Sequence, residues 1–149
     1  MIRQFQSEDA AACLALVRDC LRGDPSLAAP VREALLEGET LETIRERAKL
    51  FYIAVYETEG GIAGMAGLEM NEIRLLFVAP QLQRRGMGGE MLAHLEEMVP
   101  PTLFREVFVY SAPFAVPFYR THGYVDCGEQ LFEVHGQVLE TVFMVKPLA

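Results

Sequence analysis

A glycine-rich loop set between a strand-like segment and a helical pattern constrains the fold of this chain most. Residues 73–79 are apolar except for Arg74, and apolar residues from Met91 to Val99, Met98 among them, mark one face of a helix. The first N–H groups of a helix have no intrahelical partner, and the helix dipole favours negative charge at that end. A strand, a glycine loop and a helix in this order therefore predict a cradle for a pyrophosphate. The loop residues are Gln83, Arg84, Arg85, Gly86, Met87, Gly88 and Gly89.

The details of the loop exclude two common nucleotide motifs. No Gly-Lys-Ser/Thr follows the glycines, so the loop is not a P-loop. It also lacks the Gly-x-Gly-x-x-Gly spacing, with an acidic residue about 20 positions further on, that is typical of a dinucleotide site. Glycine at 86, 88 and 89 allows dihedrals and close approach that a side chain would block. A different phosphate-bearing ligand is expected.

Two blocks of the sequence resemble the GCN5-related N-acetyltransferase (GNAT) superfamily. The first is Gln-x-x-Gly-x-Gly over residues 83–88, preceded by Leu-Leu-Phe-Val-Ala-Pro over 75–80, and it is similar to the acetyl-CoA signature of that superfamily. The second is Phe-Tyr-x-x-x-Gly-Tyr over 118–124, within 111–124, and it is similar to a later helix and strand of the family. Both blocks come in the expected order. The resemblance covers nearly the whole chain.

The resemblance implies how acetyl-CoA binds. The backbone of residues 84–89 holds the pyrophosphate and Gln83 braces the loop. Arg84 and Arg85 are expected to make charge-assisted contacts with CoA phosphates, with a solvated loop edge as the alternative. The strand that precedes the loop, at residues 73–79, is expected to supply a backbone N–H to the thioester carbonyl, near Phe77 or Val78. The pantetheine arm pairs like an extra strand with Leu76, Phe77 and Val78.

One position departs from the family pattern. Tyr110 stands where sequences of this type often carry an Asn that helps to bind the pantetheine arm. Either Tyr110 or Ser111 must substitute for that Asn, or the contact is absent.

Tyr119 is the expected general acid. Family members with a tyrosine at the matching position use it to protonate the departing thiolate. Phenol has a pKa near 10 and a cysteine-like thiol a pKa near 8.5, so a tyrosine proton is available at neutral pH. The alternative is that Tyr119 only packs beside Phe118.

Glu72 is the candidate base. It begins the strand that leads to the loop, at a spacing where some family members place a basic Glu that acts directly or through water. Strand alternation predicts Glu72, Arg74, Leu76 and Val78 on one face. Pairing with Arg74 would lower the pKa of Glu72, so a simple strand-end ion pair stays open as the alternative.

The rest of the chain predicts one mixed α/β domain over residues 1–149. Short strands are expected at 1–6, 51–56, 62–69, 104–110, 124–127 and 138–145, with helices between them. Ser7 is expected to cap the first helix. The sheet is expected to be twisted and mostly antiparallel, and the resemblance adds that it splays open beside the glycine loop.

Charge limits the kinds of partner that we expect. The formal net charge is −8 with no basic stripe, which disfavours binding of nucleic acid and therefore RNA-directed acetylation. The same charge favours a cationic small molecule or a basic peptide. No apolar run is long enough to span a bilayer, and no signal peptide is discernible. The cysteine count is odd, without Cys-x-x-Cys, so reduced thiols and a cytoplasmic location are expected. No His pair has metal-ligand spacing, and no metal is expected.

These observations predict an acetyl-CoA-dependent N-acetyltransferase that transfers acetyl directly to a primary amine of a small molecule or peptide, in a ternary complex. The rival hypothesis is a non-catalytic acyl-CoA-binding or regulatory module of the same fold. The family resemblance leaves a homodimer possible. The acceptor, the acyl-chain preference and the oligomeric state are not specified by the sequence.

Overall fold

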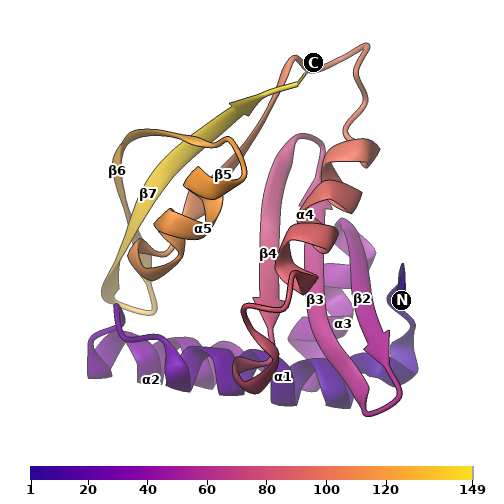
Figure 1. Cartoon of the computed structure of the whole chain (residues 1–149). Coiled ribbons are helices and arrows are strands. Elements are labelled where there is room, and N and C mark those ends of the chain that lie inside the picture. The colour runs from indigo at the N-terminus through magenta and orange to yellow at the C-terminus, as the bar shows by residue number, and fades with distance from the viewer. Residues whose placement is uncertain (149) are drawn as a thin grey trace.

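One sheet of seven strands runs through the computed structural model, which describes residues 1–148; Ala149 lies outside the described part. Its strands lie in the order β1-β2-β3-β4-β5-β7-β6, and every neighbouring pair is antiparallel except β4 and β5 (Figure 1). The strands are β1 (Ile2–Gln4), β2 (Tyr52–Thr58), β3 (Gly61–Glu69), β4 (Glu72–Val78), β5 (Glu106–Ser111), β6 (Val125–Val134) and β7 (Gln137–Pro147).

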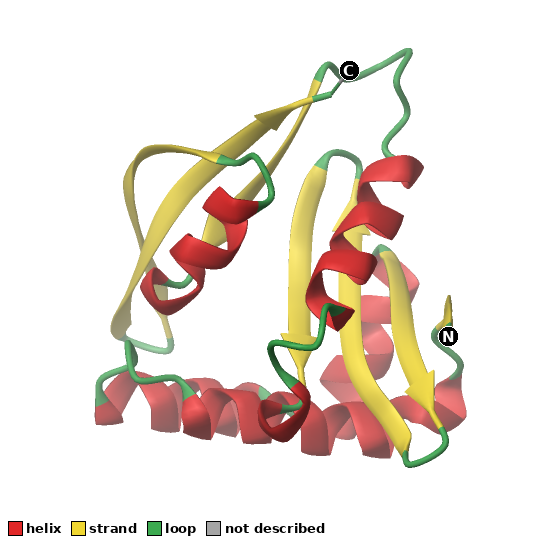
Figure 2. Cartoon of the chain, viewed as in Figure 1, coloured by secondary structure: helices red, strands yellow, loops and turns green. Residues whose placement is uncertain are grey.

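In the described part of the chain, five α-helices cover the two faces of this sheet (Figure 2). On one face α1 and α3 enclose a buried cluster with β2 and β3, and on the other α4 and α5 enclose a second cluster with β3, β5 and β7. Each face of the sheet therefore has its own apolar core. The helices are α1 (Ala10–Gly23), α2 (Ala29–Gly38), α3 (Leu41–Leu50), α4 (Met87–Met98) and α5 (Val116–Thr121).

Local sequence explains most helix ends. Pro30 lies in the first turn of α2, where its missing N–H costs nothing. Thr40 caps α3 by accepting from the N–H of Thr43 at 3.1 Å. The prediction that Ser7 caps the first helix was wrong. Ser7 begins a 3-10 turn, and the carboxylate of Asp9 instead accepts from the N–H of Gln6 at 2.8 Å.

The sheet opens between β4 and β5. These two strands run parallel and pair only at Glu72 with Phe108 and at Ile73 with Val109. Beyond that short pairing they diverge, so β5, β7 and β6 form a second arm that leans away from β4 (Figure 1). The predicted α/β class, with a mostly antiparallel and splayed sheet, is confirmed.

A β-bulge in β4 corrects the predicted strand alternation. Gly67 of β3 pairs with Leu75, but the next residue of β3 pairs with Ile73, so Arg74 is an extra residue on β4. Ile73 therefore joins Leu76 in the cluster under α4 and α5, while Leu75 packs in the cluster under α1 and α3. A strict period of two had placed Ile73 with Leu75 and Arg74 with Leu76.

Two further expectations need correction. The strand predicted at 124–127 continues to Val134, because Gly128 has φ +114° and a register shift beside it interrupts the pattern without ending the pairing with β7. Met98, expected on the buried face of α4, is exposed at the last position of that helix.

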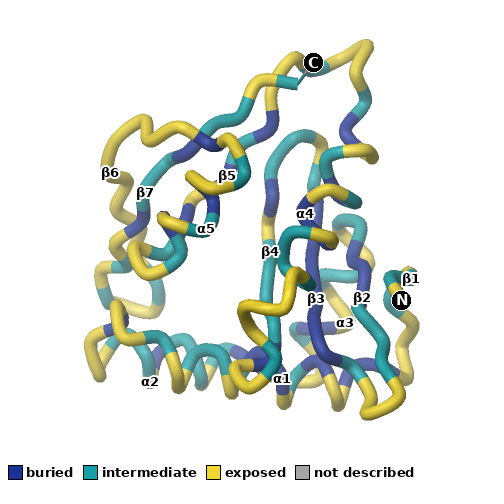
Figure 3. Tube along the Cα trace, viewed as in Figure 1, coloured by how far each residue is buried: buried dark blue, intermediate teal, exposed yellow. Residues whose placement is uncertain are grey.

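In contrast to the mostly exposed β6, β3 is buried along most of its length (Figure 3).

A polar cluster joins the two arms at the far end of α4. Glu96 of α4 accepts from the hydroxyl of Tyr124 at 2.6 Å and pairs with the ammonium of Lys146 in β7 at 3.0 Å. Burial and Glu96 together raise the pKa of Tyr124, so its hydroxyl stays a donor. The cluster links α4 to the second arm across the opening.

Candidate functional site

The glycine loop sits at the open side of the sheet and leads into α4. Gly86 is the N-cap residue of α4 with φ +87°, and Arg84 also has positive φ, at +65°. The side-chain amide of Gln83 donates to the carbonyl of Val78 at 3.1 Å, so Gln83 ties the loop to the end of β4. The predicted bracing contact is thus present in the structure.

The start of α4 offers free hydrogen-bond donors. The first helical bond is donated by Glu90 to Gly86 at 3.0 Å. The N–H groups of residues 86–89 precede it, and within residues 1–148 none of them has a hydrogen-bond partner. A side chain added at Gly86 would meet no atom within 4 Å, so the space outside this turn is open. Unpaired N–H groups and the positive end of the helix dipole fit a diphosphate there.

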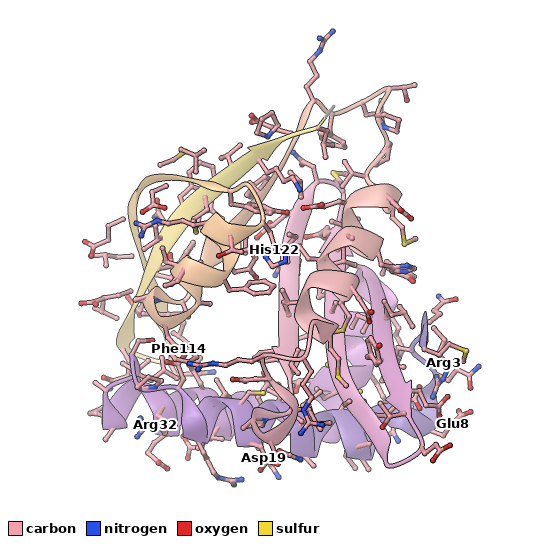
Figure 4. The ribbon with its side chains drawn as sticks, viewed as in Figure 1. Arg3, Glu8, Asp19, Arg32, Phe114 and His122 are labelled. Carbon is pink, nitrogen blue, oxygen red and sulfur yellow. The ribbon has the colours of Figure 1, made fainter. Side chains whose placement is uncertain are left out.

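Gly88 and Gly89 serve a different purpose from Gly86. A Cβ at Gly88 would lie 3.1 Å from the ring of Phe118, and one at Gly89 would lie 2.7 Å from Nε2 of His122. The two glycines therefore let α5 approach the first turn of α4. His122 extends from the end of α5 towards α4 (Figure 4).

Neither Phe118 nor His122 was predicted as part of the site. His122 Nδ1 lies 2.8 Å from the carbonyl of Phe118, and the two rings are 4.6 Å apart, so the imidazole is held in place. Both residues lie in the family-like block at 118–124, whose expected catalytic residue was Tyr119.

The second edge of β4 is unpaired beyond the short contact with β5. Ala79 donates to Ala63 of the neighbouring β3 segment at 2.8 Å. Because opposite residues of an antiparallel pair alternate between bonded and non-bonded, the main-chain groups of Leu76 and Val78 point away from β3. Those of Phe77 point towards β3. Three residues were predicted to pair with the pantetheine arm. Leu76 and Val78 direct main-chain groups into the opening between β4 and β5, whereas Phe77 does not.

Tyr119 is buried in the cluster under α4 and α5, with 5% of its surface exposed. Its ring packs edge-on against Phe118 at 5.2 Å and against Tyr124 at 5.3 Å. Burial raises the pKa of Tyr119, so the phenol is protonated at neutral pH. Burial is the only cause of that rise, and no side-chain hydrogen bond within residues 1–148 contributes to it.

Glu72 lies where β4 and β5 meet, half-buried, at the edge of a pocket of about 380 Å³. Burial raises the pKa of its carboxyl group, and Glu69 adds to that effect. Arg74, 3.8 Å from Glu72, lowers this pKa as expected, but by less than burial raises it. The expected net direction, a pKa of Glu72 below its usual value, was therefore wrong. The guanidinium of Arg74 also pairs with Glu69 at 2.6 Å.

The two predicted catalytic residues lie on different faces of the sheet. Tyr119 shares its core with Val107 and Val109 of β5. The intervening residue Phe108 faces the other way, as does Tyr110, which lines the pocket beside Glu72.

The residues proposed to replace the family Asn are also on different faces. Tyr110 lines the Glu72 pocket. Ser111 is buried on the opposite face, and its hydroxyl donates to the carbonyl of Ala112 at 2.8 Å.

Comparison with known proteins agrees with this geometry. Residues 28–146 match the family model described as the acetyltransferase (GNAT) domain, so the chain belongs to the GNAT acetyltransferase family. Membership places it among acyltransferase enzymes. A curated relative, the peptidyl-lysine N-acetyltransferase YiaC of Escherichia coli K12, is 33% identical over 79 residues, which cover 51% of this chain and 53% of the relative. The matched part thus spans about half the length of that relative.

Solved structures share the fold. A GCN5-related N-acetyltransferase from Rhodopseudomonas palustris has a TM-score of 0.93 at 21% identity, covering 99% of this chain and 95% of its own. YncA of Salmonella typhimurium, solved with acetyl-CoA, has a TM-score of 0.69 at 16% identity, covering 100% and 94%. PaiA of Thermoplasma acidophilum, solved with coenzyme A, has a TM-score of 0.74 at 16% identity, covering 99% and 98%.

Residues 1–148 contain no cluster of three or more His, Cys, Asp or Glu side chains arranged to hold a metal ion. Across the same part of the chain, no helix combines the length and apolarity needed to cross a membrane.

Proposed function

We propose that this chain is an acetyl-CoA-dependent N-acetyltransferase that moves the acetyl group directly to a primary amine of a small molecule or peptide. The observation that carries the proposal is the unpaired edge of β4 beside the free N–H groups of residues 86–89. A strand edge can pair with an extended pantetheine arm, and the helix start can hold the diphosphate attached to it. Family membership supports the same co-substrate.

The chain supplies both proton transfers that the reaction needs. Glu72 accepts a proton from the acceptor ammonium or amine, directly or through water, and its raised pKa makes it a stronger base than an ordinary carboxylate. The amine nitrogen then forms its bond to the acetyl carbon as the carbon–sulfur bond breaks. Tyr119 donates its proton to the departing thiolate, since burial keeps the phenol protonated. The N–H of Val78 or Leu76 faces the opening as a donor for the carbonyl oxygen.

Two arginines border the proposed phosphate site. Arg84 and Arg85 are exposed in the loop before α4. Their guanidinium groups are proposed to reach CoA phosphates from that position. Their contribution is expected to weaken with added salt because exposed charges are screened.

A binding assay and a turnover assay together test the proposal. Calorimetry is expected to detect acetyl-CoA binding, and thiol release is expected to require an added amine. Binding without thiol release for any amine would instead favour the non-catalytic acyl-CoA-binding module. Absence of acetyl-CoA binding at millimolar concentration would contradict both.

A matched pair of glycine variants locates the binding site. Gly86 and Gly128 both have positive φ, and an added Cβ at either would meet nothing within 4 Å, so Gly→Ala imposes similar backbone strain at both. Gly86→Ala is expected to weaken acetyl-CoA binding by about tenfold, since the strain shifts the donor groups. Gly128→Ala is the control and should leave the dissociation constant unchanged.

A further inference from the structure

The pocket beside Glu72 is formed by both arms of the sheet. It lies where β4 and β5 meet, on the face opposite α5, and its volume of about 380 Å³ suits a small molecule or one extended side chain. The lining residues come from four strands: Glu72, Ile73, Arg74, Tyr110, Phe132, Leu139 and Thr141.

Aromatic rings dominate the side of the pocket formed by the second arm. Tyr110 packs edge-on against Phe132, with ring centroids 5.0 Å apart, and also contacts Phe143 at 5.2 Å. Tyr110 and Phe132 are 36% and 37% exposed, which is unusual for large rings with close aromatic neighbours. The hydroxyl of Thr141 donates its hydrogen bond to the main-chain carbonyl of Gln130 at 2.7 Å and so is not available as a donor to a ligand. This wall can therefore contact a hydrocarbon stem or a cation over a ring face.

The other side of the pocket carries an excess of negative charge. Arg74 lies between two carboxylates, at 2.6 Å from Glu69 and 3.8 Å from Glu72. Its guanidinium carbon also lies 5.2 Å from the centre of the Phe51 ring. The lining thus contains no basic group free of acidic partners, and an incoming carboxylate would meet Glu72 before an available cation.

We propose that this pocket is the acceptor site and that it selects a primary amine on an apolar stem without a neighbouring carboxylate. The inference rests on the proposed transferase function and specifies its acceptor. Glu69 is the specificity-determining residue, because it holds Arg74 away from an acceptor carboxylate. Glu72 attracts the ammonium group, and the ring edges of Tyr110 and Phe132 contact the stem.

Paired amines that differ by one carboxylate test the selectivity. Calorimetry on the protein with CoA present compares 2-phenylethylamine with phenylalanine, and a blocked lysine peptide with free lysine. The carboxylate-free member of the first pair is expected to bind at least about tenfold more tightly, since like charges would face each other across the pocket. Equal affinities within the first pair would overturn the proposal. A peptide that binds better than 2-phenylethylamine would assign the stem to a protein lysine rather than a free amine.

A charge-removing variant tests the role of Glu69. Glu69→Gln frees Arg74, so the preference of wild-type protein for 2-phenylethylamine over phenylalanine is expected to fall at least about threefold in the same titration. Glu59→Gln removes the same charge from the exposed turn between β2 and β3 and is expected to change nothing. An unchanged preference in Glu69→Gln would refute the specificity role.

The experiments distinguish failure of the proposed transferase function from failure of the proposed amine selectivity. Thiol release from acetyl-CoA reports the proposed transferase activity, whereas amine binding in the presence of CoA reports the pocket. Selective binding without thiol release would contradict the transferase function and leave the pocket's chemistry supported. Thiol release without selective amine binding would support the transferase function and contradict the proposed chemistry of the pocket.

Discussion

At the scale of single residues, burial determines which protonation state each candidate catalytic group adopts. Tyr119 is enclosed by aromatic rings and keeps its proton, whereas Glu72 lies at a pocket edge where water still reaches the carboxylate. Both pKa values move upward for the same reason, the loss of water around the charged form. The same physical effect therefore keeps Tyr119 protonated and makes the carboxylate of Glu72 a stronger base.

Replacing Tyr119 with Phe removes the proton donor and keeps the ring, and no side-chain hydrogen bond within residues 1–148 contributes to the pKa of that hydroxyl. Turnover is expected to fall by about 10² to 10⁴ while acetyl-CoA affinity is retained. Steady-state thiol release and calorimetry measure the two quantities. Tyr124→Phe is the control, since it removes a hydroxyl bonded to Glu96 and should lower stability more than turnover. An unimpaired Tyr119→Phe enzyme would exclude the acid role.

Glu72→Gln tests the base through the pH dependence of the rate. A base acts when ionised, so the rate should rise with pH through the pKa of Glu72, which burial moves above its ordinary value of 4.5. The acidic limb of kcat/KM is therefore expected above pH 4.5 in the wild type and should vanish in the variant. A variant that retains the limb would show that another group titrates.

At the scale of elements, the contact between α4 and α5 depends on two residues without side chains. Gly88 and Gly89 lie against Phe118 and His122, so the helix that carries Tyr119 is fixed by the helix that carries the phosphate site. Two predicted binding glycines thus also have a packing role. The loop pattern predicted a ligand role for all three glycines and gave no sign of the packing, since Phe118 and His122 lie about thirty residues further along the chain.

Gly89→Ala is expected to destabilise the protein by about 1–3 kcal/mol, because the new methyl group would lie 2.7 Å from an imidazole that is held by Phe118. Combining it with His122→Ala removes the obstacle. In the His122→Ala background the same Gly89→Ala change should therefore cost nothing or stabilise the protein, since Ala exceeds Gly by about 1 kcal/mol in helix propensity. Urea unfolding of the wild type, both single variants and the double variant gives the comparison. Additive effects in this cycle would contradict the contact.

The start of α1 is expected to lose stability in acid. Arg3 donates to Asp9 at 2.8 and 2.9 Å and lowers the pKa of that carboxyl group. A lowered pKa stabilises the fold above the unfolded value of 3.8, and this contribution disappears as pH falls through the folded value. Asp9→Asn should therefore reduce the free energy of unfolding by about 1–3 kcal/mol at pH 7 and by less at pH 3. Denaturant titrations at both pH values measure the difference; equal losses would contradict the linkage.

At the scale of the whole molecule, local patterns predicted the elements, and long-range pairing determined the site. The glycine loop, most strands and the helix at Thr40 were predictable because each has a short-range signal. The bulge at Arg74 was not, since it appears only when Gly67 and Leu68 are paired with β4. For the same reason the sequence did not show that Tyr119 and Tyr110 lie on opposite faces, or that Glu69 holds Arg74.

The short pairing of β4 with β5 also has a mechanical consequence. The two arms are also connected through α4, which packs against α5 at its start and bonds to Tyr124 and Lys146 at its other end. The strands themselves meet at Glu72, whose main chain is paired with Phe108. The carboxylate of Glu72 therefore projects from a main-chain position that is tied to both arms, and an incoming amine would be placed relative to that position.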